Sequence, residues 1–512
     1  MYMAQINVVN LTYSYEDSFD AIFEDVSFSV DTNWKLGLIG RNGKGKTTFL
    51  NLLLGKYEYT GTITSSTMFD SFPYEVSHEQ MEQCATVFLE ELKAGCEEWR
   101  VICELGKLKA EADLLYQPFK NLSHGEQTKV LLALLFSGEN EFLLIDEPTN
   151  HLDYEARACV KEYLQEKKGF ILVSHDRDLL DACVDHVLVL NRKSIEVQSG
   201  NFSSWWENKN RKDHFAMAEN EKHLREIKSL KKAADRSQRW AEKSEGRKIG
   251  FDPIKENDRS ISTRAYIGAK TKKMQSRVTQ YERRMEQEIR AKEGLLQDIE
   301  NPVDLKLYPM KHHKNRLLLC KNVSVGYADS EESILKKFDF ELMQGERILL
   351  QGKNGCGKST CIQMLLSQLG KGATKQVVIR EGNIQCASGL VVSYVNQDTS
   401  FLKGNIHEFC ESQGLEERLF FALLRQLDME RTQFWKPLEF FSEGQKKKVL
   451  LASSLLTPAH LYIWDEPLNY IDVFSRMQLE KLILEYQPTM ILVDHDVCFQ
   501  EKIATRIVHL KE

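Results

Sequence analysis

Two glycine-rich stretches of this chain have the residue types and spacing needed to hold the phosphates of a nucleotide. Residues 40–47 and 352–359 both fit the pattern G-x-x-x-x-G-K-[ST]. The glycines let such a loop turn tightly and point its N–H groups at an anion, and the lysine reaches the outer phosphates. The apolar run 36–39 predicts a buried strand before the first loop, and a helix is expected to start near Thr48. The residues assigned to the two loops are Gly40, Arg41, Asn42, Gly43, Lys44, Gly45, Lys46, Thr47 and Thr48, and Gly352, Lys353, Asn354, Gly355, Cys356, Gly357, Lys358, Ser359 and Thr360.

Paired carboxylates end two apolar runs, Asp146-Glu147 in the first half and Asp465-Glu466 in the second. Beside a phosphate, the two members of a pair suit different tasks. Asp146 is predicted to hold Mg²⁺ through water, and Glu147 is predicted to orient or deprotonate the attacking water. Asp465 and Glu466 repeat the arrangement. With the loop hydroxyls, the predicted Mg²⁺ residues are Thr47, Asp146, Ser359 and Asp465.

A histidine follows each carboxylate pair further along the chain. His175 lies just after the apolar run 170–173, where an imidazole could contact the γ-phosphate side, and His495 repeats it. A single histidine at a strand end is usually structural. Two of them, each accompanied by a loop and a carboxylate pair, favour a catalytic role. The predicted catalytic residues are Glu147, Glu466, His175 and His495.

Matching motifs recur at nearly constant separations, which indicates a duplicated domain. The separations are 312 positions from Gly40 to Gly352, 319 from Asp146 to Asp465, and 320 from His175 to His495. Strand-like and helical segments alternate in each half, and this alternation predicts an α/β fold with a mostly parallel sheet. The expected boundaries are 1–204 for the first domain, 205–310 for a linker and 311–512 for the second domain.

A third motif, Ser123-His124-Gly125-Glu126, precedes a helical pattern far along the chain from Lys46. Its hydroxyl, N–H groups and helix end could bind a phosphate. Two domains that face each other could therefore complete each other's sites, with two nucleotides sandwiched between them and closure dependent on ATP. The second half repeats the motif, and the residues assigned to nucleotide binding are Ser123, Gly125, Glu126, Ser442, Gly444 and Gln445.

The segment 205–310 differs from both halves in charge and pattern. It holds 25 Lys/Arg against 18 Asp/Glu and so carries +7, although the whole chain carries -7. Such a basic segment suggests a polyanionic partner, although a passive spacer is an alternative. Apolar residues recur at helical spacing, which predicts two antiparallel helices with a tip at 247–268. The apolar residues of this seam are Leu224, Ile227, Ala234, Met274, Val278, Tyr281 and Met285.

The overall composition is that of an ordinary soluble protein. Of the 512 residues, 42% are apolar and 28% are charged, and no apolar run approaches the length of a membrane helix. The first residues do not form a signal peptide, so a cytoplasmic location is expected. The 11 cysteines include no C-x-x-C pair, which favours reduced thiols over disulfides or zinc. Cys356 is read as a small loop residue, with a thiol whose alkylation blocks nucleotide as the alternative.

Taken together, the motifs resemble those of the ABC-F family of translation ATPases. The resemblance rests on three stretches that recur in the second half, 123–127, 146–153 and 174–176. The stretches 34–43 and 461–470 look like those of Lsa-type antibiotic resistance ribosome protection proteins within that family. Lys46 and Ser123 are 77 positions apart, against 84 for Lys358 and Ser442, so the first half has no added arm, which favours the resistance type.

This resemblance implies two tandem P-loop ABC domains in a head-to-tail ATP sandwich joined by a helical hairpin. Ser442 would cap the nucleotide on Lys46, and Ser123 the one on Lys358. It also implies that Tyr15 and Tyr327 stack on adenine and that Gln397 senses Mg²⁺ and water. The implied monomer would enter the E site of the bacterial 70S ribosome, near the 23S rRNA of the peptidyl-transferase centre and the P-site tRNA. Lincosamides, pleuromutilins and streptogramin A drugs would then be lost.

Several positions depart from the family pattern. Pro73-Tyr74 stands where a glutamine is usual, so the two sites are expected to turn over unequally. His124 and Glu443 replace a small residue, and a carboxylate near a phosphate is unfavourable unless it points away. Two alternative functions stay open at this stage: a general translation factor of the same family, and the ATPase subunit of a membrane transporter.

Overall fold

The computed structural model describes residues 5–15, 21–41, 43–150, 152–191, 195–249, 276, 280, 283–285, 306–327, 333–353, 355–370, 377–427, 429 and 431–510. The chain divides into two compact units. One comprises Met1–Trp205 with Val303–Glu512, and the other is Trp206–Pro302. Both halves that carry the motifs therefore belong to the first unit. Among the described residues, no helix is both long and apolar enough to cross a membrane.

The first half is built around a six-stranded sheet in the order β5-β6-β7-β3-β8-β9. The first five strands pair in parallel, and β9 pairs antiparallel with β8. Fully buried apolar strands such as β7 are typical of a parallel sheet covered on both faces. Its strands are β3 (Lys35–Ile39), β5 (Met68–Phe72), β6 (Glu141–Asp146), β7 (Phe170–Val173), β8 (His186–Leu190) and β9 (Ile195–Ser199).

A second, antiparallel sheet of three strands completes the first half, in the order β2-β1-β4. Its inner side shares a hydrophobic core with the parallel sheet, which includes Phe23, Phe49 and Phe142. The strands are β1 (Gln5–Tyr13), β2 (Phe23–Asp31) and β4 (Thr60–Ser65). The helices of this half are α1 (Lys46–Leu53), α2 (His78–Met81), α3 (Ala85–Leu92), α4 (Glu98–Lys107), α5 (His124–Leu135), α6 (Tyr154–Glu166) and α7 (Arg177–Cys183), with the 3-10 turns η1 (Ala112–Tyr116) and η2 (Phe119–Asn121).

The second half repeats this architecture. Its parallel sheet has the order β14-β15-β16-β12-β17, and its antiparallel sheet the order β11-β10-β13. Trp464 and Tyr462 of β15 are fully buried in a large core with α12 and α13. The strands are β10 (Arg316–Tyr327), β11 (Leu335–Met343), β12 (Arg347–Gln351), β13 (Val377–Cys386), β14 (Val392–Val395), β15 (Leu461–Asp465), β16 (Met490–Val493) and β17 (Arg506–His509). The helices are α10 (Lys358–Gln368), α11 (Ile406–Ser412), α12 (Glu417–Gln426), α13 (Glu443–Leu456), α14 (Val473–Tyr486) and α15 (Val497–Ile503), with η3 (Arg431–Trp435) and η4 (Leu438–Phe440).

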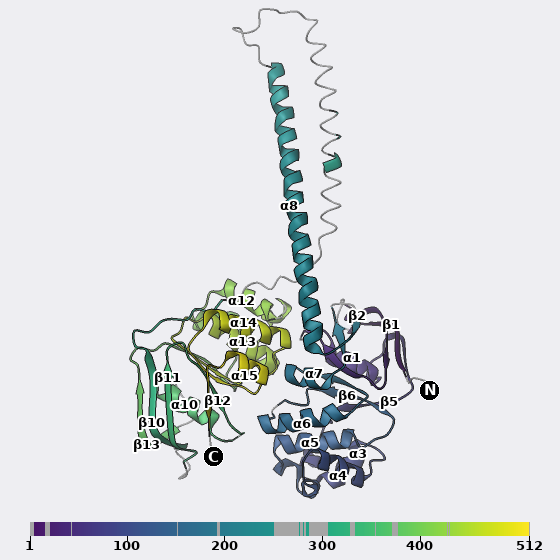
Figure 1. Ribbon diagram of the computed structural model, residues 1–512, viewed down its shortest axis with the longest axis vertical. Helices are drawn as coiled ribbons and strands as arrows, with labels where there is room; N and C mark the ends of the chain where they lie inside the picture. The colour runs from purple at the N-terminus through teal and green to yellow at the C-terminus, as the bar shows by residue number, and fades with distance from the viewer. Residues whose placement is uncertain are drawn as a thin grey trace, which may run out of the picture. The chain divides into compact units, whose positions relative to one another are not determined.

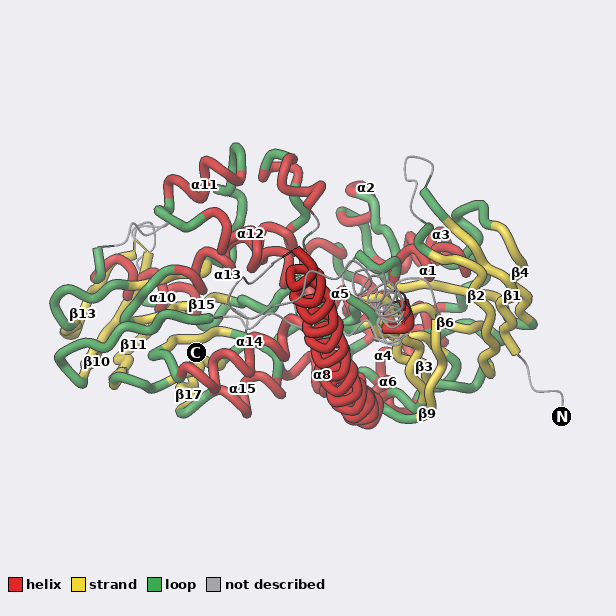
Figure 2. Tube along the Cα trace, turned by 90° about the horizontal axis from the view of Figure 1, so that it is seen from above, coloured by secondary structure: helices red, strands yellow, loops and turns green. Residues whose placement is uncertain are grey.

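The prediction of a duplicated α/β fold with mostly parallel sheets is confirmed. Figure 1 shows α10 beside β10 and β13, and Figure 2 shows the antiparallel strands of each half next to one another. The helix expected near Thr48 begins two residues earlier, at Lys46. Gly45 adopts a left-handed conformation at the N-cap position, which turns the chain directly from the loop into the helix.

The segment between the halves begins as one long helix, α8 (Phe202–Ile249), of 48 residues. Figure 1 draws it as a continuous ribbon. Of the predicted seam residues, Ile227 and Met285 are buried, whereas Leu224 is exposed. The seam positions Met274, Val278 and Tyr281 and most of the predicted tip, 250–268, lie outside the described residues.

Candidate ATP-binding and catalytic site

Each phosphate-binding loop folds over its own lysine. Lys46 Nζ donates to the Gly40 carbonyl at 2.8 Å, and Lys358 Nζ donates to the Gly352 carbonyl at 2.6 Å. Gly357 has φ +95°, and a Cβ there would lie 2.9 Å from Ile334 Cγ2, so only glycine fits this turn. Both lysines thus lie where a triphosphate could replace a carbonyl as partner. Of the predicted loop residues, Asn42 and Asn354 lie outside the described part of the chain.

A hydroxyl and a carboxylate meet at the start of each loop helix. Thr47 Oγ1 donates to Asp146 Oδ2 at 3.1 Å. In the second half, burial and the neighbouring Glu466 raise the pKa of Asp465 to about 7, against a lowering effect of a hydrogen bond to Ser359. Oδ1 of Asp465 is buried without a hydrogen-bond partner. Closely placed oxygen ligands, one of them a buried carboxylate oxygen that lacks a partner, fit a hard cation such as Mg²⁺.

In the first half, Glu147 and His175 lie side by side at the ends of adjacent strands β6 and β7. His175 Nε2 is 3.3 Å from Glu147 Oε1. Burial and the Asp146 carboxylate raise the pKa of Glu147 to about 7. Burial, Lys46 and Arg476 lower the pKa of His175 well below its usual range. A neutral imidazole and a carboxylate of raised pKa form a pair that suits proton transfer or positioning of a water molecule.

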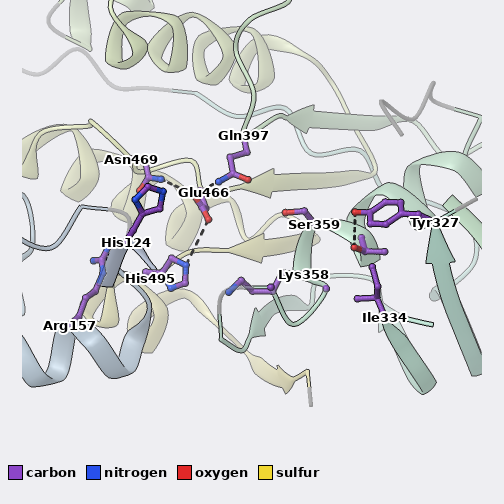
Figure 3. Close-up of a pocket in the computed structure, with 13 residues that line it drawn as sticks. His124, Arg157, Tyr327, Ile334, Lys358, Ser359, Gln397, Glu466, Asn469 and His495 are labelled. Atoms are coloured by element: carbon purple, nitrogen blue, oxygen red, sulfur yellow. Dashed lines mark hydrogen bonds and ion pairs between the residues drawn. The ribbon is translucent and has the colours of Figure 1, made fainter. Parts of the chain in front are cut away.

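The second half holds its carboxylate with two amides. Oε2 of Glu466 accepts from Gln397 Nε2 at 2.8 Å and from Asn469 Nδ2 at 2.7 Å, while His495 Nε2 lies 3.8 Å from Oε1. Burial and Lys358 lower the pKa of His495 to about 3, so its ring is neutral. Figure 3 shows Gln397, Asn469 and His495 around Glu466. This carboxylate is therefore fixed more fully than its counterpart Glu147.

A cavity of 470 Å³ lies in front of the second loop and is lined by residues of both halves. His124 and Arg157 of the first half face it together with Lys358 and Glu466 of the second, as Figure 3 shows. This volume lies in the range of small-molecule sites. The complete set of lining residues is His124, Arg157, Tyr327, Ile334, Gly355, Gly357, Lys358, Ser359, Thr360, Gln397, Glu466, Asn469 and His495.

The two predicted adenine-stacking tyrosines lie at the loop helices. Tyr327 lines the cavity, and its hydroxyl is 3.0 Å from Thr360 Oγ1. In the first half, the Tyr15 hydroxyl is 2.7 Å from Thr48 Oγ1, and its ring is 42% exposed. Both hydroxyls thus bond the second residue after a loop lysine, and the rings flank the loops.

The Ser123 and Ser442 motifs both open a helix with a reciprocal cap. Ser123 Oγ accepts from the Glu126 N–H at 3.3 Å, and the Glu126 carboxylate accepts from the Ser123 N–H at 2.8 Å. Ser442 and Gln445 bond in the same way. This capping box leaves the other N–H groups of the first turn available for an anion.

Two further residues of the motifs contact their own half. A Cβ on Gly444 would lie 3.1 Å from the Tyr470 backbone oxygen, so glycine permits this close approach. Glu443 accepts a 2.6 Å bond from Thr399 Oγ1, which holds its carboxylate within the second half. The unfavourable orientation considered from the sequence is thereby avoided.

Charged residues of the second half act on Lys46 of the first loop. Burial lowers the pKa of Lys46, and Asp472 and Lys448 also act on it, in opposite directions. Both residues lie on or next to the elements that follow the Ser442 motif and Glu466.

Sequence reasoning missed Arg157 and Arg476. Arg476 donates from Nε to the Ile471 carbonyl at 2.9 Å and from Nη1 to Asp496 Oδ2 at 2.9 Å. Arg157 similarly donates to the Leu152 carbonyl at 3.0 Å. The two arginines are 319 positions apart, the separation of the carboxylate pairs, and that regularity could have revealed them.

The sequence profile described as "ABC transporter" matches residues 23–150 and 335–469, which together make up half of the chain. The chain belongs to the ABC transporter family. It is an ATP hydrolase, and its two ABC domains in one chain give it the tandem arrangement of the ABC-F type.

Curated relatives match almost the whole chain. The ribosome protection protein VmlR of Bacillus subtilis is 26% identical over 97% of this ABC ATPase and 85% of its own length. The ABC transporter F family member 5 of Arabidopsis thaliana is 24% identical over 99% of this chain and 75% of its own. Among solved structures, an archaeal ribosome recycling factor, aABCE1, aligns over 98% of this chain and 87% of its own with a TM-score of 0.60 at 18% identity, which shows a common fold.

Proposed function

We propose that this ABC ATPase binds the bacterial ribosome in its ATP-bound state and protects it from antibiotics of the peptidyl-transferase centre. In this proposal the two ABC domains close on ATP, and the segment between them enters the exit (E) site near 23S rRNA and the P-site tRNA. Bound lincosamide, pleuromutilin or streptogramin A is displaced or kept out. Hydrolysis of ATP then releases the protein, which acts as a monomer in the cytoplasm.

The observation that carries the proposal is the long helix α8 between the two ATPase halves. Its 48 residues correspond to roughly 72 Å at about 1.5 Å per residue. A flexible joint between two ATPase domains does not require a helix of this length. The similarity to VmlR, whose name states ribosome protection, extends over 97% of the chain and so includes this segment.

Charge on α8 supports RNA as the partner. Lys232, Arg236 and Arg239 are exposed on the described helix. Such side chains bind phosphates without reading sequence and make affinity depend on salt. The proposed contact residues are Lys231, Lys232, Arg236, Arg239, Lys270, Lys272, Lys273 and Arg277, of which the last four lie outside the described residues.

The nucleotide chemistry follows from the two sites. Thr47 with Asp146, and Ser359 with Asp465 and Gln397, would hold Mg²⁺, which neutralises phosphate charge when bound. Glu147 and Glu466 would orient or deprotonate the water, beside His175 and His495. Tyr15 and Tyr327 would stack on adenine. The presence of His124 in the cavity of Lys358 supports capping of that nucleotide by the Ser123 motif.

Drug susceptibility of a sensitive bacterium that expresses the chain tests this proposal. Expression should raise the minimum inhibitory concentration of lincomycin, a pleuromutilin or a streptogramin A. Deletion of 247–268 should abolish that rise while ATP hydrolysis by the purified chain persists. The matched control is Glu147→Gln combined with Glu466→Gln, which removes hydrolysis but leaves the tip intact.

Two outcomes would favour the alternative functions. An unchanged inhibitory concentration with retained ribosome binding would support a general translation factor. Co-purification with a membrane partner, without ribosomes, would support a transporter ATPase. Either result overturns drug protection.

A further inference from the structure

A buried ion pair joins helix α7 of the first half to helix α14 of the second. Arg177 Nη1 donates to Glu480 Oε2 at 3.1 Å, and its Nη2 contacts Oε1 of the same carboxylate. The two side chains are only 5% and 6% exposed. A bidentate guanidinium–carboxylate pair fixes both the distance and the relative orientation of its two side chains. Arg177 therefore holds α7 against the second half.

The same arginine lies close in the chain to His175 of the first site and approaches the residue that follows His495 of the second site. It follows His175 of the first site by two residues in the chain. Its Nη2 is also 4.0 Å from Oδ1 of Asp496, which directly follows His495 of the second site. Burial and the Asp496 carboxylate raise the pKa of Asp176, so the residues after the two histidines are close neighbours.

The network continues from Asp496 to the catalytic segment of the second half. Asp496 Oδ2 accepts from Arg476 Nη1 at 2.9 Å. Arg476 in turn donates from Nη2 to the Leu468 carbonyl at 3.0 Å, two residues after Glu466. A continuous set of buried polar contacts thus leads from the segment beside Glu466 to the start of α7 beside His175.

Within the described residues, the Arg177–Glu480 ion pair has no counterpart at the duplicated positions. The positions equivalent to Arg177 and Glu480 are Val497 and Lys161. Lys161 bonds Asp178 at 2.6 Å, which is an ion pair within the first half, and its side chain is 31% exposed. The duplicated fold therefore forms without such an ion pair at Val497 and Lys161. A buried pair between the halves occurs at only one of the two equivalent places.

We propose that Arg177 is a positioning residue that couples the two ATP sites. Nucleotide at the second site sets the position of the His495–Asp496 segment. Through Asp496 and Glu480, Arg177 passes that position to α7 and so to His175 of the first site. Separation of a buried pair leaves uncompensated charges, so α7 moves with the second half rather than away from it. By thermodynamic linkage, ATP at the first site changes the ATP affinity of the second site by the same factor.

A double-mutant cycle between Arg177 and Glu466 tests the coupling with purified full-length chain, ATP and Mg²⁺, without ribosomes. Glu466→Gln blocks hydrolysis at the second site, and the KM for ATP of the overall turnover is measured with and without this substitution in each Arg177 background. With Arg177 present, Glu466→Gln should change that KM at least about fivefold. With Arg177→Met, the same substitution should change it by less than about twofold. An equal change in both backgrounds, or no change with Arg177 present, overturns the proposal.

Two further variants separate coupling from stability. Arg177→Glu combined with Glu480→Arg should restore the dependence if the pair acts as proposed. Glu480→Gln should abolish the dependence with less disturbance of packing. This variant replaces Arg177→Met if circular dichroism shows that Arg177→Met does not fold. Lys161→Met is the matched control, since it removes an ion pair from the equivalent position within one half, and it should leave the dependence intact. Loss of the dependence in Lys161→Met, or no restoration by the charge exchange, also contradicts the proposal.

Discussion

Gln397 donates a 2.8 Å hydrogen bond to Glu466, and this bond connects the segment after β14 to the carboxylate that follows β15. The first half has no such bond among its described residues. Tyr74 stands at the equivalent position, because both residues follow a strand that pairs with the strand of the carboxylates in the same register. Its hydroxyl donates instead to Asp70 Oδ2 at 2.6 Å. The two ATP sites therefore differ in how their carboxylates are held.

Gln397→Ala should lower hydrolysis at the second site by about 10- to 100-fold. A hydrogen bond to a charged group contributes about 1.4–3 kcal/mol, and each 1.4 kcal/mol of activation free energy changes a rate about tenfold. The measurement uses the Glu147→Gln background, in which only the second site turns over. Gln397→Glu is an informative companion, since it keeps the shape but places a second carboxylate beside Glu466. Unchanged turnover in Gln397→Ala would show that the amide does not position Glu466.

Tyr74→Phe should lower the thermal midpoint by an amount that corresponds to about 1 kcal/mol, because it removes one half-buried hydrogen bond. The lost bond belongs to a structural cluster in which Lys93 Nζ bonds Asp70 at 2.8 Å and Glu141 at 2.6 Å. Hydrolysis at the first site should stay within about twofold, since the hydroxyl faces Asp70. A large loss of turnover with normal stability would instead assign Tyr74 a place in catalysis.

Burial and the neighbouring Asp496 raise the pKa of Asp494 from 3.8 to about 6. The folded chain therefore holds this proton more tightly than the unfolded chain, and stability is lost as pH rises from about 4 through 6. Oδ2 is buried without a hydrogen-bond partner, and the burial outweighs the opposing effects of Arg476 and of the Asp496 N–H. Asp494→Asn should raise the free energy of unfolding by up to about 3 kcal/mol at pH 8 and by roughly half as much at pH 5, so the thermal midpoint should rise more at pH 8.

The control for this prediction is Glu58→Gln, a change of the same charge at an exposed position. It should shift the midpoint equally at both pH values. A shift for Asp494→Asn that is equal at pH 5 and pH 8 would mean that Asp494 titrates normally.

Much of the fold follows from local pattern. The loops 40–47 and 352–359, the strands that precede them and the helices that follow are encoded within short stretches, and the constant separations imply the duplication. Alternating strands and helices predicted a mostly parallel sheet, which the main sheet of each half confirms, whereas the antiparallel three-stranded sheet of each half was not predicted. Such features depend on neighbours along the chain, so they can be recognised without tertiary structure.

The partners of the site residues could not be predicted in the same way. The bond of Tyr74 to Asp70 and the pair of Arg177 with Glu480 depend on how side chains meet after packing. Arg177 and Glu480 are 303 positions apart, and no periodicity relates an arginine of one half to a glutamate of the other. The sequence showed that Pro73-Tyr74 stands where a glutamine is usual, but it gave no sign that the Tyr74 hydroxyl bonds Asp70.

ATP-dependent binding to the ribosome through the segment between the ABC domains can be measured by sedimentation of the Glu147→Gln, Glu466→Gln variant with purified bacterial 70S ribosomes. We expect this variant to pellet with ribosomes in ATP, to do so much less in ADP, and to be released as salt rises. A folded variant that stays in the supernatant with ATP at low salt would contradict ATP-dependent ribosome binding.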